Sequence, residues 1–180
     1  MIEADNVTLD LNGFAITGAG GGGIGITESA ESGGRAGIVI LNGTIAKVGA
    51  AVFMPRSTRV HIEQIHVSAT TVGIALGTDA AVTSADSIVA RNIVSVATGS
   101  GIFIGRNSIA TGNVVSGGGL RASQRSLITG NTVSKSVDGI TVECPSNVVE
   151  NTAQGNANFD AVFVGSDCSK ANNSFGTVSP

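Results

Sequence analysis

Two aspartates in the C-terminal third of the chain have side chains that could act together in catalysis. Asp138 and Asp160 lie 22 residues apart, and each directly precedes a small residue that opens an apolar segment. If these segments stack, the carboxylates become neighbours, and a shared proton or a bound cation would relieve their repulsion. Retaining glycosidases hold two carboxyl groups about 5 Å apart, a separation that this pair could satisfy. The alternative is that each aspartate hydrogen-bonds the backbone of a tight turn.

Two further charged residues complete this candidate catalytic set. Arg121 lies one segment before Asp138 and could bind an acidic sugar, while Glu143 is close enough in sequence to assist. The set Arg121, Asp138, Asp160 and Glu143 would suit a small polysaccharide lyase or glycoside hydrolase acting on acidic glycans.

The chain offers few metal ligands. His61, Glu63 and His66 form its only histidine cluster, and a spacing of two places His61 and Glu63 on the same side of a strand. Zinc would require at least one further protein ligand, and no other histidine or paired cysteine stands nearby in sequence. We therefore predict no metal site and no cofactor. Calcium would be compatible with the aspartates, but no calcium-binding motif supports it.

Cys144 and Cys168 are the only cysteines, and each follows an apolar segment by a similar offset. Stacked segments would bring their Cα atoms to about the separation of a disulfide. A bridge would suit an exported protein, whereas two buried reduced thiols explain the same residues. Both interpretations stay open from the sequence.

The elements that position these residues must be nearly all β. The 180 residues are 42% hydrophobic and 13% charged, enough to bury one core in a single domain over residues 1–180. Among the apolar residues, 21 Val and 17 Ile stand against 6 Leu, which favours β-branched packing in strands over helix. The 26 glycines show no collagen period and therefore serve turns.

Charge and hydropathy exclude two classes of partner. A net charge of −3 does not favour a nucleic-acid partner, because phosphate binding requires clustered Lys and Arg. No run of 18 apolar residues could cross a membrane, and the opening residues Met1–Val7 have neither the basic region nor the apolar core of a signal peptide. Trp and Tyr are absent, so six Phe supply all the aromatic surface that a sugar could contact.

A short segment consisting of a small residue followed by apolar, variable and apolar positions recurs along the chain, seven times in all. Its copies include Ala51–Met54, Gly73–Leu76, Gly101–Ile104 and Gly139–Val142, and the seven successive copies lie 18 to 28 residues apart. A period this short, with no helix, predicts coils that stack as a parallel β-helix of about seven to eight turns over residues 5–175.

A second recurring segment places an asparagine at an equivalent corner. An asparagine in this position tolerates the left-handed conformation and can hydrogen-bond its copy in the next coil. The sequence therefore predicts an asparagine ladder formed by Asn92, Asn113, Asn131 and Asn151.

These repeats, together with the opening stretch Asn6–Ile16, resemble the right-handed parallel β-helix repeat family, the pectate-lyase-like superfamily. The resemblance implies an all-β, single-stranded right-handed β-helix and an extracellular or cell-surface location. The catalytic strings of pectate lyases and polygalacturonases do not occur here, and we expect the β-helix to lack the usual end caps. We therefore expect a non-catalytic or degenerate β-helix scaffold that self-associates and binds polysaccharide, with the small lyase or hydrolase as the alternative.

One outer face of the predicted β-helix is the candidate ligand or interface surface. Alternation places on it the residue between the two inward apolar positions of each segment. The expected members of this face are Phe53, Phe103, Arg121, Thr141 and Phe163. An exposed row of Phe, together with unpaired strand edges at the ends, predicts a homo-oligomer. The alternative is that the loops at 18–24 and 28–36 cover the face.

Overall fold

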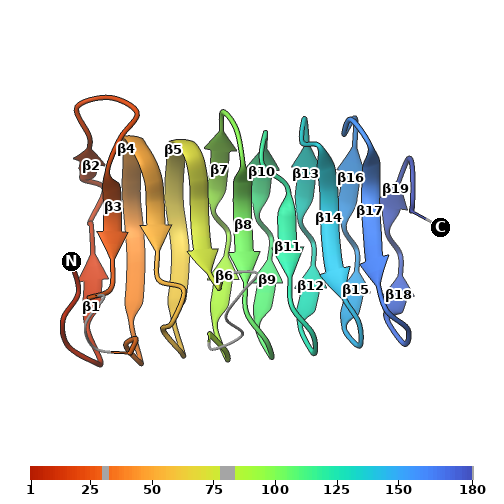
Figure 1. Cartoon of the computed structure of the whole chain (residues 1–180), viewed down its shortest axis with the longest axis horizontal. Helices are drawn as coiled ribbons and strands as arrows, with labels where there is room; N and C mark the ends of the chain where they lie inside the picture. The colour runs from red at the N-terminus through yellow and green to blue at the C-terminus, as the bar shows by residue number, and fades with distance from the viewer. Residues whose placement is uncertain (30–32, 78–83, 180) are drawn as a thin grey trace.

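The computed structural model describes residues 1–29, 33–77 and 84–179 (Figure 1). These residues contain β-strands and no helix, and the strands belong to one parallel β-solenoid. The predicted fold class is thereby confirmed. In Figure 1 the solenoid axis runs horizontally, with the N-terminal coil at one end and the C-terminal coil at the other.

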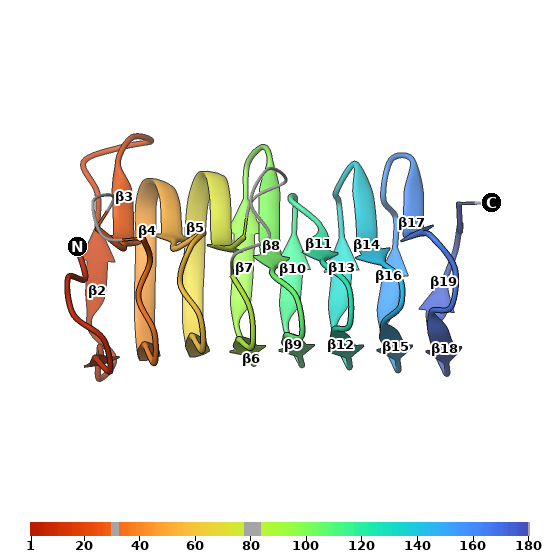
Figure 2. The same ribbon diagram turned by 60° about the horizontal axis from the view of Figure 1, so that its bottom comes forward.

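The strands of each coil stack in register on those of the next coil, and they form three faces (Figure 2). Two long strands, β4 (Val39–Phe53) and β5 (His61–Leu76), bend through all three faces. Face 1 also contains β1 (Thr8–Asp10), β6 (Ile88–Ala90), β9 (Ile109–Thr111), β12 (Leu127–Thr129), β15 (Asn147–Val149) and β18 (Ser169–Ala171). Face 2 also contains β2 (Ala15–Thr17), β7 (Ile93–Val96), β10 (Val114–Ser116), β13 (Thr132–Ser134), β16 (Thr152–Gln154) and β19 (Ser174–Phe175). Face 3 also contains β3 (Ile24–Thr27), β8 (Ser100–Ile104), β11 (Leu120–Ala122), β14 (Asp138–Glu143) and β17 (Phe159–Val164).

The core is a tube filled by the inward residue of each strand. Because alternate side chains of a strand point to opposite sides, one branched aliphatic residue per short strand suffices to fill it. On face 1, for example, the inward row is fully buried from the second coil to the seventh and comprises Ile40, Ile62, Val89, Ala110, Ile128 and Val148.

The asparagine ladder runs along the corner between faces 1 and 2. The Nδ2 of Asn92 donates to Oδ1 of Asn113 at 3.0 Å, and Asn113 donates in the same way to Asn131 at 2.9 Å. The ladder continues through Asn151 to Asn173, which the sequence analysis missed. Each of these Oδ1 atoms also accepts the backbone N–H of the preceding asparagine. The predicted ladder is thus present and one rung longer.

Buried serines form a second ladder at another corner, which the sequence analysis did not predict. The hydroxyl of Ser108 accepts the backbone N–H of Ser87 at 3.1 Å, and that of Ser126 accepts the N–H of Ser108 at 3.4 Å. Ser146 continues the row, because its hydroxyl accepts the N–H of Ser126 at 3.1 Å. Backbone donors that would be orphaned inside two corners are therefore satisfied by side chains.

The glycine near the start of β8 is required by crowding. A Cβ at Gly101 would stand 2.5 Å from Cγ1 of Val115 and 2.6 Å from the carbonyl oxygen of Gly119. Neither distance is compatible with a real side chain, so the corner requires glycine.

In the described residues, no helix is long and apolar enough to cross a membrane.

Replacing Asn131 with alanine tests the ladder. The side chain is 1% exposed and bonds both neighbouring coils, so its loss leaves buried donors and acceptors unsatisfied. We expect a loss of about 1–3 kcal/mol in the free energy of unfolding, measured by chemical denaturation. Asn158→Ala is the matched control, because Asn158 is exposed outside the ladder and should change stability little. Equal losses in the two variants would contradict the ladder's structural role.

Candidate functional site

Register places one outward residue per coil in a row along face 3. The order from the N-terminal end is Thr27, Phe53, Ala75, Phe103, Arg121, Thr141 and Val162. Four of the five residues expected on this face therefore lie in this row, and Phe163 does not. We call it the groove row.

Arg121 is the central charged residue of the groove row. Its guanidinium carbon lies 5.4 Å from the centroid of the Phe103 ring, within the range of a cation–π contact. A guanidinium nitrogen also lies 3.9 Å from the carboxylate of Glu143. Phe103 is only 8% exposed. The expected row of solvent-exposed Phe side chains is thus wrong at this position, because the neighbouring coil places an arginine over the ring.

Two shallow hollows flank Arg121, and we call the two together the face 3 groove. The first, of about 200 Å³, is lined by Phe53, Ala75 and Phe103. The second, of about 260 Å³, is lined by Asp138, Thr141 and the glycines of two turns. Arg121 and Ser100 line both hollows. The groove thus has an apolar half and a polar half along the solenoid axis.

Asp138 supplies the carboxylate of the polar half. Its Oδ1 is shielded from solvent and has no hydrogen-bond partner among the described residues. An unsatisfied buried acceptor of this kind is costly in a folded protein, so a rotation of the carboxyl group that brings this oxygen to a donor in the hollow would be favourable.

Asp160 does not join Asp138 in the groove. Asp138 pairs with Phe159, and Ile140 pairs with Ala161, so Asp160 stands opposite Gly139. The expected stacking of the two aspartates is therefore wrong by one residue. The physical reason lies at the C-terminal end, where Asp160 is held by groups from two neighbouring turns.

The carboxylate of Asp160 fastens the C-terminal turns. Oδ1 accepts the Nδ2 of Asn156 at 2.7 Å and its backbone N–H at 3.1 Å. Oδ2 accepts the backbone N–H of Thr177 at 2.8 Å and its hydroxyl at 3.1 Å. Burial acts to raise the pKa of Asp160, but these four hydrogen bonds outweigh it and hold the pKa below its usual value. A carboxylate engaged in this way is a structural group.

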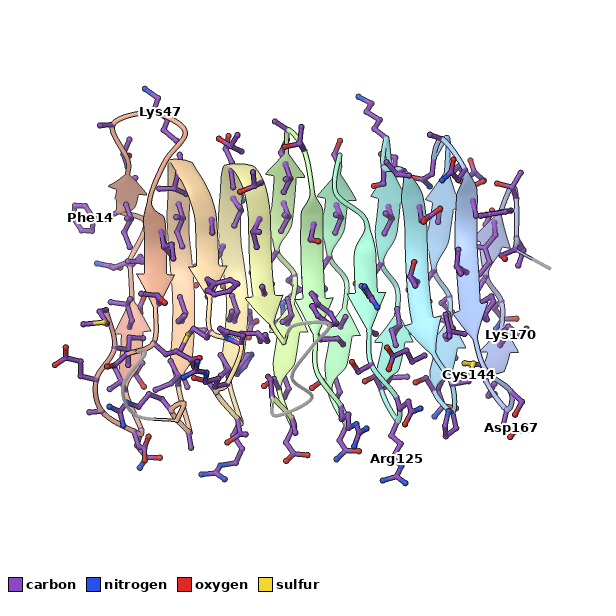
Figure 3. All side chains as sticks on the ribbon, in the orientation of Figure 1. Phe14, Lys47, Arg125, Cys144, Asp167 and Lys170 are labelled. Atoms are coloured by element: carbon purple, nitrogen blue, oxygen red, sulfur yellow. A yellow bond between two sulfur atoms is a disulfide. The ribbon has the colours of Figure 1, made fainter. Side chains whose placement is uncertain are left out.

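The same shift of register moves Phe163 off the groove row. Phe163 pairs with Val142, which is fully buried, so its ring lies on the core side of the last coil. Its centroid is 6.3 Å from that of Phe175, and the Nζ of Lys170 lies 4.4 Å from it. Figure 3 shows Lys170 in the C-terminal coil. Phe163 therefore packs at the C-terminal end of the solenoid and does not lie on the groove row.

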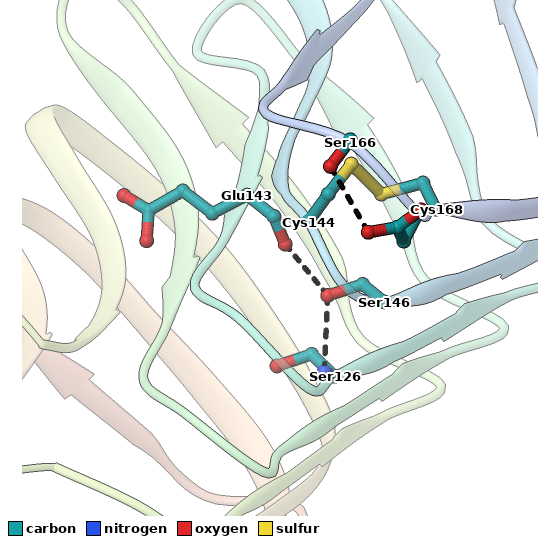
Figure 4. Close-up of a disulfide and its surroundings, with 7 residues drawn as sticks. Ser126, Glu143, Cys144, Ser146, Ser166 and Cys168 are labelled. Atoms are coloured by element: carbon teal, nitrogen blue, oxygen red, sulfur yellow. Dashed lines mark hydrogen bonds between the residues drawn. A yellow bond between two sulfur atoms is a disulfide. The ribbon is translucent and has the colours of Figure 1, made fainter.

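The two cysteines are joined by a disulfide. Cys144 and Cys168 have Cα atoms 5.0 Å apart and link β14 to the turn before β18. Figure 4 shows Ser146 beside the bridge, where its hydroxyl donates to the carbonyl of Glu143 at 2.7 Å. Cys144 directly follows Glu143, so the bridge anchors the C-terminal end of β14.

The histidine cluster holds an ion-pair network on face 1. The Nε2 of His61 lies 2.9 Å from a carboxylate oxygen of Glu63, and Arg91 pairs with the same carboxylate. His66 lies on face 2, in register with Thr44 and Ile93. No group of three or more His, Cys, Asp or Glu side chains suited to a metal gathers in the described part of the chain.

Comparison with known families adds one match to this geometry. The family NosD, described as "periplasmic copper-binding protein", matches residues 5–178. The chain belongs to the NosD family. This family is a right-handed β-helix family, as the repeats indicated, whereas the pectate-lyase-like superfamily gives no direct match. Searches of curated proteins and of solved structures gave no match.

The described residues of this NosD family member do not fit a copper site. Copper favours thiolate, thioether and imidazole ligands. Both cysteines are bound in the disulfide and Met54 is fully buried in the core. His61 is engaged by Glu63 on face 1, whereas His66 lies on face 2. We therefore derive no chemistry of this chain through copper.

Replacing Asp160 with asparagine tests its structural role. Asparagine would place an NH2 group where one carboxylate oxygen now accepts two hydrogen bonds. We therefore expect a loss of about 1–3 kcal/mol in unfolding free energy at neutral pH. In the parent protein the pKa of Asp160 is lower in the folded state than in the unfolded state, where it is near 3.8. The ionised carboxylate therefore stabilises the fold fully above this unfolded pKa, and the stabilisation is lost as the pH falls through the folded-state pKa.

Chemical denaturation at several pH values measures both effects. Asp86→Asn is the control, because Asp86 is exposed and lies outside the C-terminal turns. A stable Asp160→Asn protein with unchanged acid sensitivity would contradict the assignment.

Proposed function

We propose that this NosD family protein is a non-catalytic β-helix scaffold that binds polysaccharide along the face 3 groove. The observation that carries the proposal is the groove itself, in which an aromatic ring capped by a guanidinium joins an apolar hollow to a polar one. Binding sites for small polar ligands combine apolar walls with a few placed polar groups in this way.

The groove offers surfaces for both sides of a sugar ring. Phe53 and Phe103 flank the small Ala75, so a ring could lie over the alanine between them. The hydroxyls of Ser100 and Thr141 and the carboxylate of Asp138 line the other half, where sugar hydroxyls find partners. The groove crosses successive coils, which suits an extended chain better than a single compact molecule.

The arrangement of carboxylates favours binding over hydrolysis. A glycosidase needs two carboxyl groups on opposite sides of the scissile bond. Asp160 is occupied in the C-terminal turns, and Glu143 faces Arg121 at 3.9 Å. Asp138 thus remains as one carboxylate without an equivalent second one. A lyase or hydrolase using Arg121, Asp138 and Glu143 is the rival outcome of the test below.

An extracytoplasmic location is part of the proposal. The family description is periplasmic, and a disulfide persists in oxidising compartments. Polysaccharides are abundant in the same surroundings.

Phe103→Ala tests polysaccharide binding. Isothermal titration of the protein with acidic, neutral and amino oligosaccharides should identify a ligand. The variant should bind it about tenfold more weakly, because Arg121 loses the ring on which it packs and the apolar hollow loses a wall. Phe14→Ala is the control, since Phe14 is 73% exposed at the N-terminal coil and should bind normally.

Chromatography of the same mixtures after long incubation should show unshortened chains. Turnover that depends on Asp138 or Glu143 would overturn the scaffold in favour of the enzyme, and binding by no glycan would overturn the proposed function.

Self-association through the N-terminal end is the second part of the proposed function. There a hollow of about 430 Å³ is lined by apolar side chains that include Leu9, Ile16 and Ile26. The opposite end differs, because Lys170 occupies the inward row of Val148. An inward charge on an edge strand discourages stacking of another coil. We therefore expect two copies to meet through their N-terminal ends as a symmetric dimer.

Light scattering of the 180-residue chain measures this association. We expect a dimer that Leu9→Lys dissociates, because the substitution introduces a charge into the apolar contact. Phe103→Asp should leave the dimer intact, because the groove is not the contact. A monomeric parent protein, or a dimer dissociated only by Phe103→Asp, would contradict the N-terminal interface.

A further inference from the structure

Asp138 is the carboxylate that lines the polar half of the face 3 groove, and Arg121 is its one guanidinium. Glu143 lines neither hollow, but its carboxylate lies 3.9 Å from Arg121 and offsets that positive charge. The whole chain also carries a net charge of −3. The local field therefore favours a neutral or cationic group over an anion.

Arg121 is not well placed to attract an anionic sugar. Its guanidinium lies over the Phe103 ring and 3.9 Å from the Glu143 carboxylate. A uronic acid carboxylate would compete with Glu143 for the guanidinium and would be repelled by Asp138 across the same hollow. Arg121 is thus better described as a flat platform whose charge Glu143 already balances.

Asp138 lacks a hydrogen-bond donor. Its Oδ1 is shielded from solvent and unpartnered within the described chain, while the residue as a whole lines the hollow. Hydrogen bonds between an ammonium and a carboxylate are roughly twice as strong as those between neutral groups. A ligand amine at this carboxylate would therefore contribute more than a hydroxyl would.

The hollow around Asp138 is kept open by its backbone. A Cβ at Gly118 would stand 2.3 Å from the backbone nitrogen of Gly101, so this wall must remain without a side chain. Val137, which is 64% exposed, supplies an apolar wall, and Thr141 supplies a hydroxyl. The space therefore offers an apolar contact, a hydroxyl and a carboxylate to one sugar unit.

From this chemistry we infer that the groove selects glycans built from amino sugars with free amines, with Asp138 receiving the amine. The inference rests on the proposed function, since it names the ligand class of the same groove. It reverses the expectation that Arg121 recognises an acidic sugar.

Three oligosaccharides of equal length test the inference by isothermal titration at a mildly acidic pH. They are a β-1,4-glucosamine oligomer, its fully N-acetylated counterpart and an oligogalacturonate. The amine oligomer should bind about tenfold or more tightly than either of the others, as expected for a charge-assisted bond. Asp138→Asn should remove that advantage and leave binding of the N-acetylated oligomer within about twofold.

Asp86→Asn is the matched control, because it removes one exposed carboxylate far along the sequence from the groove. It should leave the preference intact, whereas an equal loss in this variant would reveal unspecific attraction and overturn the inference. Tightest binding of the oligogalacturonate, or equal binding of the amine and N-acetylated oligomers, would overturn the amine selectivity while the proposed function stands. Binding of none of the three, or of any other glycan, would overturn both.

Discussion

The structure depends on keeping successive coils in register around corners that are sealed from water. A parallel β-helix turns its backbone inside the protein, and each corner leaves N–H groups that the strands cannot pair. Asn113 and Asn131 solve this with one side chain per coil, since each Oδ1 accepts two donors and each Nδ2 reaches the next coil. The serine row does the same elsewhere with a hydroxyl. Register is therefore specified at the corners and then propagated along the faces.

The groove is a consequence of that register. Phe103, Arg121 and Thr141 come from three different strands and meet only because β8, β11 and β14 align residue by residue. A slip of one residue would turn each of them inward. The last coil shows the effect, because Asp160 takes the position of a glycine and Phe163 points into the tube. The groove therefore ends before the last coil, where these two side chains pack at the C-terminal end of the solenoid.

Repeats carried most of the fold prediction. The period near 20 residues and the asparagines at equivalent corners were sufficient for a parallel β-helix with its ladder, because both features are local and repeated. Asn173 was missed because its coil lacks the preceding apolar pattern. The disulfide stayed open because two cysteines at similar offsets fit a bridge and buried thiols equally well. The structure places their Cα atoms 5.0 Å apart and joins them.

The candidate site was harder to predict because single positions decide it. From the sequence, either Asp160 or Ala161 could be the small residue that opens the last segment. Hydrogen bonds of Asp160 to Thr177, 17 residues later, favour the register in which Asp160 stands opposite Gly139. Phe103 was expected to be exposed because pairing with Arg121 in the next coil is a long-range contact. The family match gives the architecture, while its copper-binding description finds no suitable ligand group in the described residues.

The central claim is that the face 3 groove binds a glycan chain without cleaving it. A crystal structure of the protein after prolonged soaking with a glucosamine oligomer tests this most directly. The account predicts an intact chain along the groove, with one ring near Phe103 and an amine within hydrogen-bond distance of Asp138. A cleaved product in the groove, or a ligand bound elsewhere with the groove empty, would contradict it.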